Sequence, residues 1–203
     1  MADQENNISL IFGRKHCGKS TLAKTLVKDA RRLIVLDIQG EYKIGKVVNS
    51  MQDFTRFIRE HQTARDLRIT YCPEYNLSLK TIFKAVCKIV LALRDVTFLV
   101  EEVGCFASNA TSFPEIFGIL VQKARHRQIN LVAITQRATK IPRDIRSQAD
   151  VIYTFQQVEP GDIKYISQFM KLKDVERIEK LSDHKFIEWL PDGKTEIKKI
   201  TFR

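Results

Sequence analysis

The sequence has 203 residues, a formal net charge of +10 at pH 7 and four cysteines. A chain of this length can bury a sizeable core, so we expect a single domain over residues 1–203, with a core at about 8–155 and C-terminal helices and a hairpin at 156–203. No apolar stretch approaches the roughly eighteen residues of a membrane-spanning helix, and residues 1–7 are too polar for a signal peptide, so we expect neither. The positive charge favours a polyanionic partner, nucleic acid first, over a basic surface without a partner.

The cysteines form no C-x-x-C pair and have no histidine at zinc-ligand spacing. They are Cys17, Cys72, Cys87 and Cys105. Cysteines of this kind are typical of reduced thiols in a cytosolic protein, so we expect a cytoplasmic location.

The first elements along the chain surround a glycine-rich loop. Residues 8–12 are β-branched and apolar, as in a buried strand, and residues 21–28 continue at helical spacing. Between them, residues 13–20 spell G-x-x-x-x-G-K-[ST], the P-loop, whose backbone N–H groups point at phosphates beside a helix N-terminus. The predicted nucleotide-binding residues are Gly13, Arg14, Lys15, His16, Cys17, Gly18, Lys19, Ser20 and Thr21.

Two side chains of this loop have specific predicted tasks. Lys19 is expected to reach the β- and γ-phosphates, and the hydroxyl of Ser20 to bind Mg²⁺. A chance match of the pattern is the alternative, and the flanking strand and helix argue against it. The sequence therefore predicts a site for ATP and Mg²⁺.

Strand and helix patterns alternate through the rest of the chain. Further strands are expected at 32–37, 67–72, 96–100, 129–134 and 150–155, and helices at 51–62, 78–94 and 114–125. Two short helical stretches follow, and then a hairpin of residues 185–190 and 194–202 that turns on 191–193. This alternation predicts an α/β fold with a mostly parallel sheet.

Two adjacent carboxylates follow the apolar strand at 96–100. An Mg²⁺-ATP site needs an acid beside the metal and a base for the attacking water. Glu101 is the candidate metal ligand, and Glu102 is the candidate base. Paired acids at a solvated strand end are the alternative.

A glutamine follows the next strand, and arginines precede that strand. Gln136 stands where parallel sheets present ligands, so it is a candidate sensor of the γ-phosphate and the attacking water; a strand cap is the alternative. Arg125, with Arg127 close behind, is a candidate arginine finger for a neighbouring subunit; a favourable helix-dipole pairing is the alternative. After Gln136, a basic loop formed by Lys140, Arg143 and Arg146 is a candidate for contact with nucleic-acid phosphates.

These motifs together resemble the HerA/FtsK superfamily of DNA-translocating ATPases. The resemblance covers residues 8–155 and rests on 13–20, 36–42, 99–102, 124–137 and 145–155. It implies a RecA-like P-loop NTPase fold of the ASCE class, a three-layer sandwich whose central sheet has the order 5-1-4-3-2, here followed by the C-terminal β-hairpin.

The resemblance also implies roles and partners. It implies Glu102 as catalytic base, Gln136 as sensor and Arg125 or a nearby arginine as a finger acting in trans. It also implies a homo-oligomeric ring, often a hexamer, that threads double-stranded DNA. Asp37 and Glu41 match the group's Asp-x-x-Gly-Glu-Tyr pattern, to which physics alone assigns no role. The group usually has Asp-Glu where this chain has Glu101-Glu102, so the extra methylene makes the metal role of Glu101 less secure than that of Ser20.

We expect no counterpart of the membrane anchor or the N-terminal barrel of larger members of the group. It is similar in length to the genome-packaging ATPases of tailless icosahedral viruses with an internal membrane. This similarity implies a viral packaging motor in the host cytoplasm or at the virion vertex, with a capsid vertex or portal component as a further partner.

Other functions fit part of the pattern. A HerA-like helicase or a plasmid DNA-transfer ATPase is the alternative within the group. A P-loop small-molecule kinase would need an acceptor pocket and an arginine-bearing lid, whereas the paired glutamates and Gln136 favour water as the acceptor. A nucleotide-gated binding module would show negligible turnover.

Overall fold

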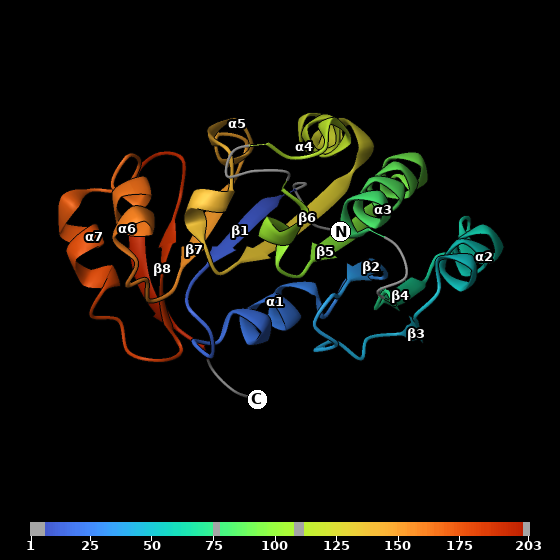
Figure 1. Ribbon diagram of the computed structural model, residues 1–203, viewed down its shortest axis with the longest axis horizontal. Helices are drawn as coiled ribbons and strands as arrows, with labels where there is room; N and C mark the ends of the chain where they lie inside the picture. Colours follow the sequence, from blue (N-terminus) through green and yellow to red (C-terminus); the bar gives the residue numbers. More distant parts are fainter. Residues whose placement is uncertain (1–6, 75–77, 108–111, 201–203) are drawn as a thin grey trace.

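The computed structural model describes residues 7–74, 78–107 and 112–200, and strands and helices alternate along them (Figure 1). The strands are β1 (Ile8–Phe12), β2 (Arg32–Leu36), β3 (Lys46–Val48), β4 (Leu67–Tyr71), β5 (Val96–Val100), β6 (Ile129–Thr135), β7 (Val151–Thr154), β8 (Lys185–Trp189) and β9 (Thr195–Lys199). The helices are α1 (Lys19–Val27), α2 (Met51–His61), α3 (Leu79–Leu93), α4 (Glu115–Arg127), α5 (Arg143–Arg146), α6 (Pro160–Ile166) and α7 (Leu172–Ile178), with 3-10 turns η1 (Val103–Phe106) and η2 (Ala138–Lys140).

The sheet is larger than the sequence predicted. Within the described residues it has nine strands in the order β3-β4-β2-β5-β6-β1-β7-β8-β9, which differs from the expected 5-1-4-3-2. The five strands expected by that order are consecutive as β7, β1, β6, β5 and β2, but β4 and β3 extend one edge and β8 and β9 the other. The short β3 carries too little pattern to be recognised, because it has only three residues.

The C-terminal hairpin belongs to this sheet. β8 pairs antiparallel with β7, and β9 pairs antiparallel with β8, whereas the other pairings are parallel. The expected hairpin ended at residue 202; β9 ends at Lys199, and residues 201–202 lie outside the described part of the chain. A local pattern predicts a hairpin but not the strand that it joins.

Both faces of the sheet are covered by helices. Along β2, Leu33 and Val35 pack with α1 on one face, and Ile34 and Leu36 pack with α2 and α3 on the other. Figure 1 shows α1 on one side of the sheet and α3 and α4 on the opposite side. Strands buried on both faces lack a polar alternation, which explains the continuous apolar runs in the sequence.

The register of the parallel strands aligns their carboxyl ends. Phe12 pairs with Thr135, Leu36 pairs with Val100, and Val100 pairs with Ala133. Because these strands end together, the segments that follow β1, β2, β5 and β6 meet at the carboxyl ends of the strands, which we call the carboxyl edge. This is where α/β folds bind ligands.

No helix in the described ranges is both long and apolar enough to cross a membrane. All four cysteines have free thiols.

Candidate nucleotide-binding site

The glycine-rich loop connects β1 to α1, as the sequence predicted. A Cβ atom at Gly13 would lie 2.6 Å from the Cβ of Phe155, and one at Gly18 would lie 2.7 Å from Cδ1 of Ile200. Gly18 also has φ of 106°, which disfavours other residues. Close packing therefore requires glycine at Gly13, and the left-handed backbone favours it at Gly18.

Inside the loop, two side chains converge on one carbonyl. Nζ of Lys19 donates to the carbonyl oxygen of Arg14 at 2.8 Å, and Sγ of Cys17 donates to the same oxygen at 2.9 Å. Lys19 is 7% exposed, so its charge lies within the fold at the start of α1. Burial raises the pKa of Cys17, which keeps this thiol neutral.

The far side of the loop is held by C-terminal segments that the sequence analysis did not connect with it. The guanidinium of Arg14 donates to Oε1 of Gln156 at 2.5 Å and to Oδ1 of Asp183 at 2.7 Å. The backbone N–H of His184 donates to the carbonyl of Cys17 at 3.1 Å. These residues are distant in sequence and belong to no motif, so no sequence signal identifies them.

A pocket of about 620 Å³ opens between the P-loop and the carboxyl ends of the strands. It is lined by Lys15, His16, Gly18, Lys19, Ser20, Thr21, Lys24, Gln39, Glu41, Glu101, Gln136 and His184. The structure therefore brings together Lys19, Ser20, Glu101 and Gln136, four of the candidate residues named from the sequence. Of the other predicted binding residues, Gly13 and Cys17 are buried beneath the loop, and the Arg14 side chain is turned toward Gln156 and Asp183.

The loop after β2 is built around one buried carboxylate. Asp37 is fully buried and accepts N–H groups from Gln39 at 3.1 Å, Gly40 at 2.8 Å and Tyr42 at 2.8 Å. Gly40 supplies the positive φ of 74° that this turn needs. Asp37 thus folds the Asp-x-x-Gly-Glu-Tyr segment, whose role the sequence alone left open.

This fold of the loop places Glu41 against the P-loop. Oγ of Ser20 donates to Oε2 of Glu41 at 2.5 Å, and Nζ of Lys24 donates to the Glu41 carbonyl at 2.9 Å. The ammonium group of Lys24 also lies 5.0 Å from the centre of the Tyr42 ring. A carboxylate therefore stands beside the hydroxyl that was predicted to bind Mg²⁺, and the sequence analysis had assigned it no role.

The next residue of the loop holds the first of the paired glutamates. The hydroxyl of Tyr42 donates to Oε2 of Glu101 at 2.6 Å, and Glu101 is 3% exposed. Burial, with the charges of Glu41 and Glu102, raises the pKa of Glu101 to about 7, although the bond from Tyr42 and the charge of Lys19 lower it. Tyr42 is itself buried, and burial together with Glu101 raises the pKa of its hydroxyl.

The second glutamate is turned toward β6. Oε1 of Glu102 accepts from Oγ1 of Thr135 at 3.0 Å, and both carboxylate oxygens lie 3.2 Å from the backbone nitrogen of Gln136. Glu102 has φ of 48° and ψ of 52°, a left-handed conformation that is costly for a non-glycine residue. Glu102 is 8% exposed and stands beside Gln136, whereas Glu101 lines the pocket itself.

The predicted arginine finger lies at the amino ends of the strands, which we call the amino edge, whereas the P-loop pocket lies at their carboxyl ends. Arg125, near the end of α4, forms an ion pair with Asp150, and Oδ2 of Asp150 accepts the N–H of Ile8, the first residue of β1. The length of the strands separates Arg125 from the P-loop of its own chain, because the P-loop follows the opposite end of β1. Arg127 lies at the same edge, where its carbonyl accepts the N–H of Asp95 at 2.9 Å.

The predicted basic loop is only partly available for contact. Arg146 is 8% exposed, and its guanidinium carbon lies 4.8 Å from the Tyr165 ring centre and 4.7 Å from that of Phe169. The structure therefore corrects the expectation for Arg146, which packs α5 against α6 and its following turn because aromatic rings there cover its planar cation. Arg143 is exposed, and Lys140 is half-buried.

No protein-family model matches the sequence, and no curated protein matches it. Solved structures do. The genome-packaging NTPase B204 from Sulfolobus turreted icosahedral virus 2, in complex with AMPPCP, is 19% identical with a TM-score of 0.77, and the match covers 98% of this chain and 100% of that one. The same NTPase in complex with ATP-gammaS gives 19% identity and a TM-score of 0.75 over 97% of this chain and 98% of that one.

Two further solved structures extend the likeness. VirB4 of Thermoanaerobacter pseudethanolicus is 11% identical with a TM-score of 0.71, covering 100% of this chain and 91% of that one. The cytoplasmic domain of the Thermomonospora curvata type VII secretion ATPase EccC is 14% identical with a TM-score of 0.56, covering 98% of this chain but 24% of that one. B204 and VirB4 belong to the HerA/FtsK-type P-loop ATPase group, and the present chain shares the fold of that group.

Proposed function

We propose that this chain is an ATPase that translocates double-stranded DNA and serves as a viral genome-packaging motor. The observation that carries the proposal is the convergence of Lys19, Ser20, Glu101 and Gln136 on one pocket, in a chain whose fold matches a genome-packaging NTPase over nearly its whole length. On this view residues 1–203 act as a single ATPase domain.

The proposed roles follow the positions of the side chains. Lys19 binds the β- and γ-phosphates, with the N–H groups of the P-loop around them. Glu102 accepts a proton from the attacking water, because it stands beside Gln136 at the carboxyl edge of the sheet. Gln136 contacts the γ-phosphate and that water. The two glutamates therefore have different proposed roles: Glu102 is the base, and Glu101, which lines the pocket directly, is not.

The residues near Ser20 fit a bound Mg²⁺. Magnesium prefers oxygen ligands, and the Ser20 hydroxyl stands 2.5 Å from Oε2 of Glu41, with Glu101 lining the same pocket. Ser20 and Glu101 are the proposed ligands, and Glu41 adds a third oxygen donor, directly or through water. When bound there, the ion would supply positive charge that neutralises the charge developing on the phosphates.

The proposed assembly is a homo-oligomeric ring. Arg125 lies at the amino edge of the sheet and the P-loop at the carboxyl edge, so Arg125 acts in this proposal only on the nucleotide of a neighbouring subunit. A head-to-tail contact of this kind closes into a ring, for which a hexamer is the proposed size. Duplex DNA is the proposed cargo, and a capsid vertex or portal component is a further proposed partner, in the host cytoplasm or at the virion vertex.

A second candidate lies within the same fold group. The match to VirB4 over 91% of that chain favours an ATPase of another machine of the HerA/FtsK type, such as a helicase or a plasmid DNA-transfer ATPase. Hydrolysis would be the same in both cases, and the difference would lie in the partner that receives the DNA.

Phosphate release, measured in Mg²⁺ with and without duplex DNA, tests the proposal. Wild-type protein should hydrolyse ATP, and duplex DNA should stimulate turnover. Lys19→Ala should bind no nucleotide, whereas Lys28→Ala, an exposed lysine beyond α1, should behave as the wild type. Absence of hydrolysis by assembled protein would overturn the assignment as an ATPase. Transfer of phosphate to a small molecule would instead identify the protein as a kinase.

A further inference from the structure

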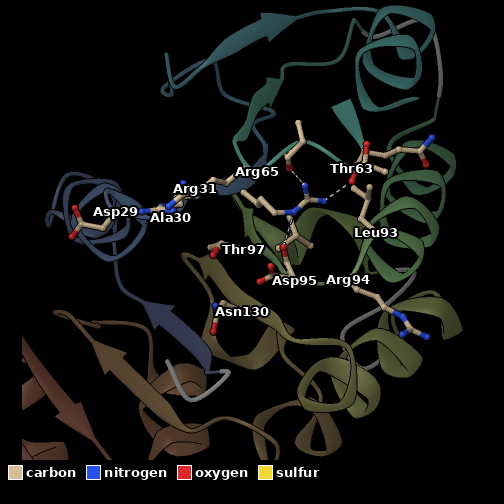
Figure 2. Close-up of a pocket in the computed structure, with 14 residues that line it drawn as sticks. Asp29, Ala30, Arg31, Thr63, Arg65, Leu93, Arg94, Asp95, Thr97 and Asn130 are labelled. Atoms are coloured by element: carbon tan, nitrogen blue, oxygen red, sulfur yellow. Dashed lines mark hydrogen bonds between the residues drawn. The ribbon is translucent and has the colours of Figure 1, made fainter. Parts of the chain in front are cut away.

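A second pocket lies at the amino edge of the sheet, where β2, β4, β5 and β6 begin (Figure 2). We call it the amino-edge pocket; its volume is about 580 Å³, close to the 620 Å³ of the P-loop pocket. The two pockets stand at opposite ends of the same strands, since Arg32 begins β2 while Asp37 follows its end. A ligand at the amino edge would therefore not touch the nucleotide.

One arginine builds the floor of this pocket. The guanidinium of Arg32 donates to three backbone carbonyls, at 2.9 Å to Asp95, at 3.0 Å to Gln62 and also to Ala64. These bonds tie the starts of β4 and β5 to the start of β2. Three of the five N–H groups of Arg32 are engaged in this way, so its main contribution is to shape the pocket and add positive charge to it.

Three other arginines belong to the lining of the pocket. Arg31, Arg65 and Arg94 are exposed, and no carboxylate of the described residues lies within ion-pair distance of them. Figure 2 shows Arg31 and Arg94 on opposite sides of the pocket, with the side chain of Arg94 extending outward from the rim. The lining contains four arginines against two aspartates, Asp29 and Asp95, so the pocket has a net positive charge.

Other features of the lining narrow the class of anion. None of the fourteen described lining residues is aromatic, so the pocket has no ring on which an unpaired base could stack. The exposed hydroxyl of Thr63 and the amide of Asn130 add neutral polar groups; Oδ1 of Asn130 already accepts from Asn7, which leaves its amide N–H groups as donors. Guanidinium and amide donors without a stacking surface suit phosphate oxygens rather than bases.

The rim also holds an unusual stretch of backbone. Arg94 has φ of 54° and ψ of 166°, and Asp95 has φ of 40°, so two consecutive non-glycine residues have positive φ. Two backbone bonds hold this turn, from Asp95 to Arg127 at 2.9 Å and from Val96 to Gln128 at 3.2 Å. Glycine would relieve the strain here, yet the chain places an arginine at the pocket rim.

We propose that the amino-edge pocket binds the phosphate backbone of duplex DNA through Arg31, Arg65 and Arg94. This proposal rests on the proposed function and locates its DNA contact away from the basic loop, in which Arg146 is buried. Binding through phosphates is independent of base sequence, as a motor that moves along a duplex requires.

The test is a titration of a short mixed-sequence DNA duplex over a range of salt concentrations. The triple variant Arg31→Gln, Arg65→Gln, Arg94→Gln should bind on the order of 10²-fold more weakly at low salt, with a salt slope shallower by about 3, because each arginine releases about one counterion. The matched control is Lys171→Gln, Lys173→Gln, Lys180→Gln, which removes the same charge from exposed positions just before, in and just after α7. It should leave both values nearly unchanged.

Further measurements show whether the arginine variant is folded and whether the pocket recognises phosphate rather than negative charge in general. Affinity for an ATP analogue and the unfolding midpoint should be equal in both triple variants and the wild type, which shows that the arginine variant is folded. Inorganic polyphosphate should displace the duplex, and polyglutamate should do so far less well. Equal displacement by polyglutamate would overturn the assignment to phosphate.

The failure of this proposal differs from the failure of the proposed function. Wild-type protein that hydrolyses ATP but binds no duplex at low salt would overturn both the pocket and DNA translocation. Duplex binding that the arginine variant retains in full would overturn the pocket alone. An equal loss in the arginine and lysine variants would assign DNA binding to overall charge, and would also overturn the pocket.

Discussion

The hydroxyl of Tyr42 donates a 2.6 Å hydrogen bond to Oε2 of Glu101, joining the loop after β2 to the end of β5. This bond connects two motifs that stand 59 residues apart. It also favours the charged form of a carboxylate that burial would otherwise keep protonated, since the pKa of Glu101 is about 7.

The raised pKa of Glu101 predicts a pH-dependent stability of the protein without nucleotide. Between the ordinary glutamate pKa of 4.5 and the raised pKa of about 7, the folded state holds a proton that the unfolded state releases, so the free energy of unfolding falls as pH rises through this window. The loss from this group is on the order of 3 kcal/mol. Urea unfolding across the window should show that Glu101→Gln lacks this fall.

Tyr42→Phe should extend the same window to higher pH, because it removes the bond that lowers the pKa of Glu101. Its ATPase activity should therefore rise with pH at higher values than in the wild type. Identical pH profiles of stability and turnover in Tyr42→Phe and the wild type would show that the bond does not influence Glu101.

Substitution of each paired glutamate separates the proposed base from the proposed metal ligand. Glu102→Gln should keep ATP affinity and lower turnover by on the order of 10²–10⁴-fold, because a positioned general base contributes that much. Glu101→Gln should instead weaken Mg²⁺ binding, measured by titration of Mn²⁺ in the presence of an ATP analogue. Wild-type turnover in Glu102→Gln together with inactive Glu101→Gln would reverse the two roles.

Loss of the Asp37 carboxylate should unfold the loop that places Glu41 and Tyr42. Asp37→Ala removes the acceptor for three buried or half-buried N–H groups, so the free energy of unfolding should fall by about 3 kcal/mol or more. Asp66→Ala, at an exposed position, is the control and should change stability little. Urea unfolding measures both, and nucleotide affinity should fall only in the Asp37 variant.

A finger acting in trans predicts complementation between inactive variants. Arg125→Ala should lower turnover by about 10³-fold or more, as for other arginine fingers, yet cost at most about 1 kcal/mol of stability because its ion pair is exposed. Mixing Arg125→Ala with Glu102→Gln should restore turnover at mixed interfaces. Wild-type specific activity should also increase with protein concentration. If neither occurs, Arg125 has a structural role only.

Because Arg146 is buried and Arg143 is exposed, we expect Arg146 to contribute to the stability of the protein and Arg143 not to do so. Arg146→Gln should lower the free energy of unfolding by on the order of 2 kcal/mol, since it removes contacts with the rings of Tyr165 and Phe169. Arg143→Gln, in the same helix but exposed, should have little effect. Thermal unfolding compares the two, and equal midpoints would contradict the role given to Arg146.

The P-loop and the central strands could be predicted from the sequence because their signals are local. The glycine spacing at 13–20, the apolar runs of β1, β2, β5 and β6, and the acids or glutamine that follow them each occupy a few consecutive residues. Since parallel strands end at one edge, such local patterns suffice to bring Lys19, Ser20, Glu101 and Gln136 into one pocket.

Only the tertiary structure decided which distant residues complete these motifs. The role of Asp37 depends on N–H groups that converge on its carboxylate only once the loop is folded. The contact of Glu41 with Ser20 likewise joins two loops at the carboxyl ends of the strands. The burial of Arg146 depends on aromatic rings about twenty residues later, and the sheet order depends on β8 pairing with β7. Pairing and burial are set by the packing of the whole chain, and residues that meet only in the folded state leave no shared pattern in the sequence.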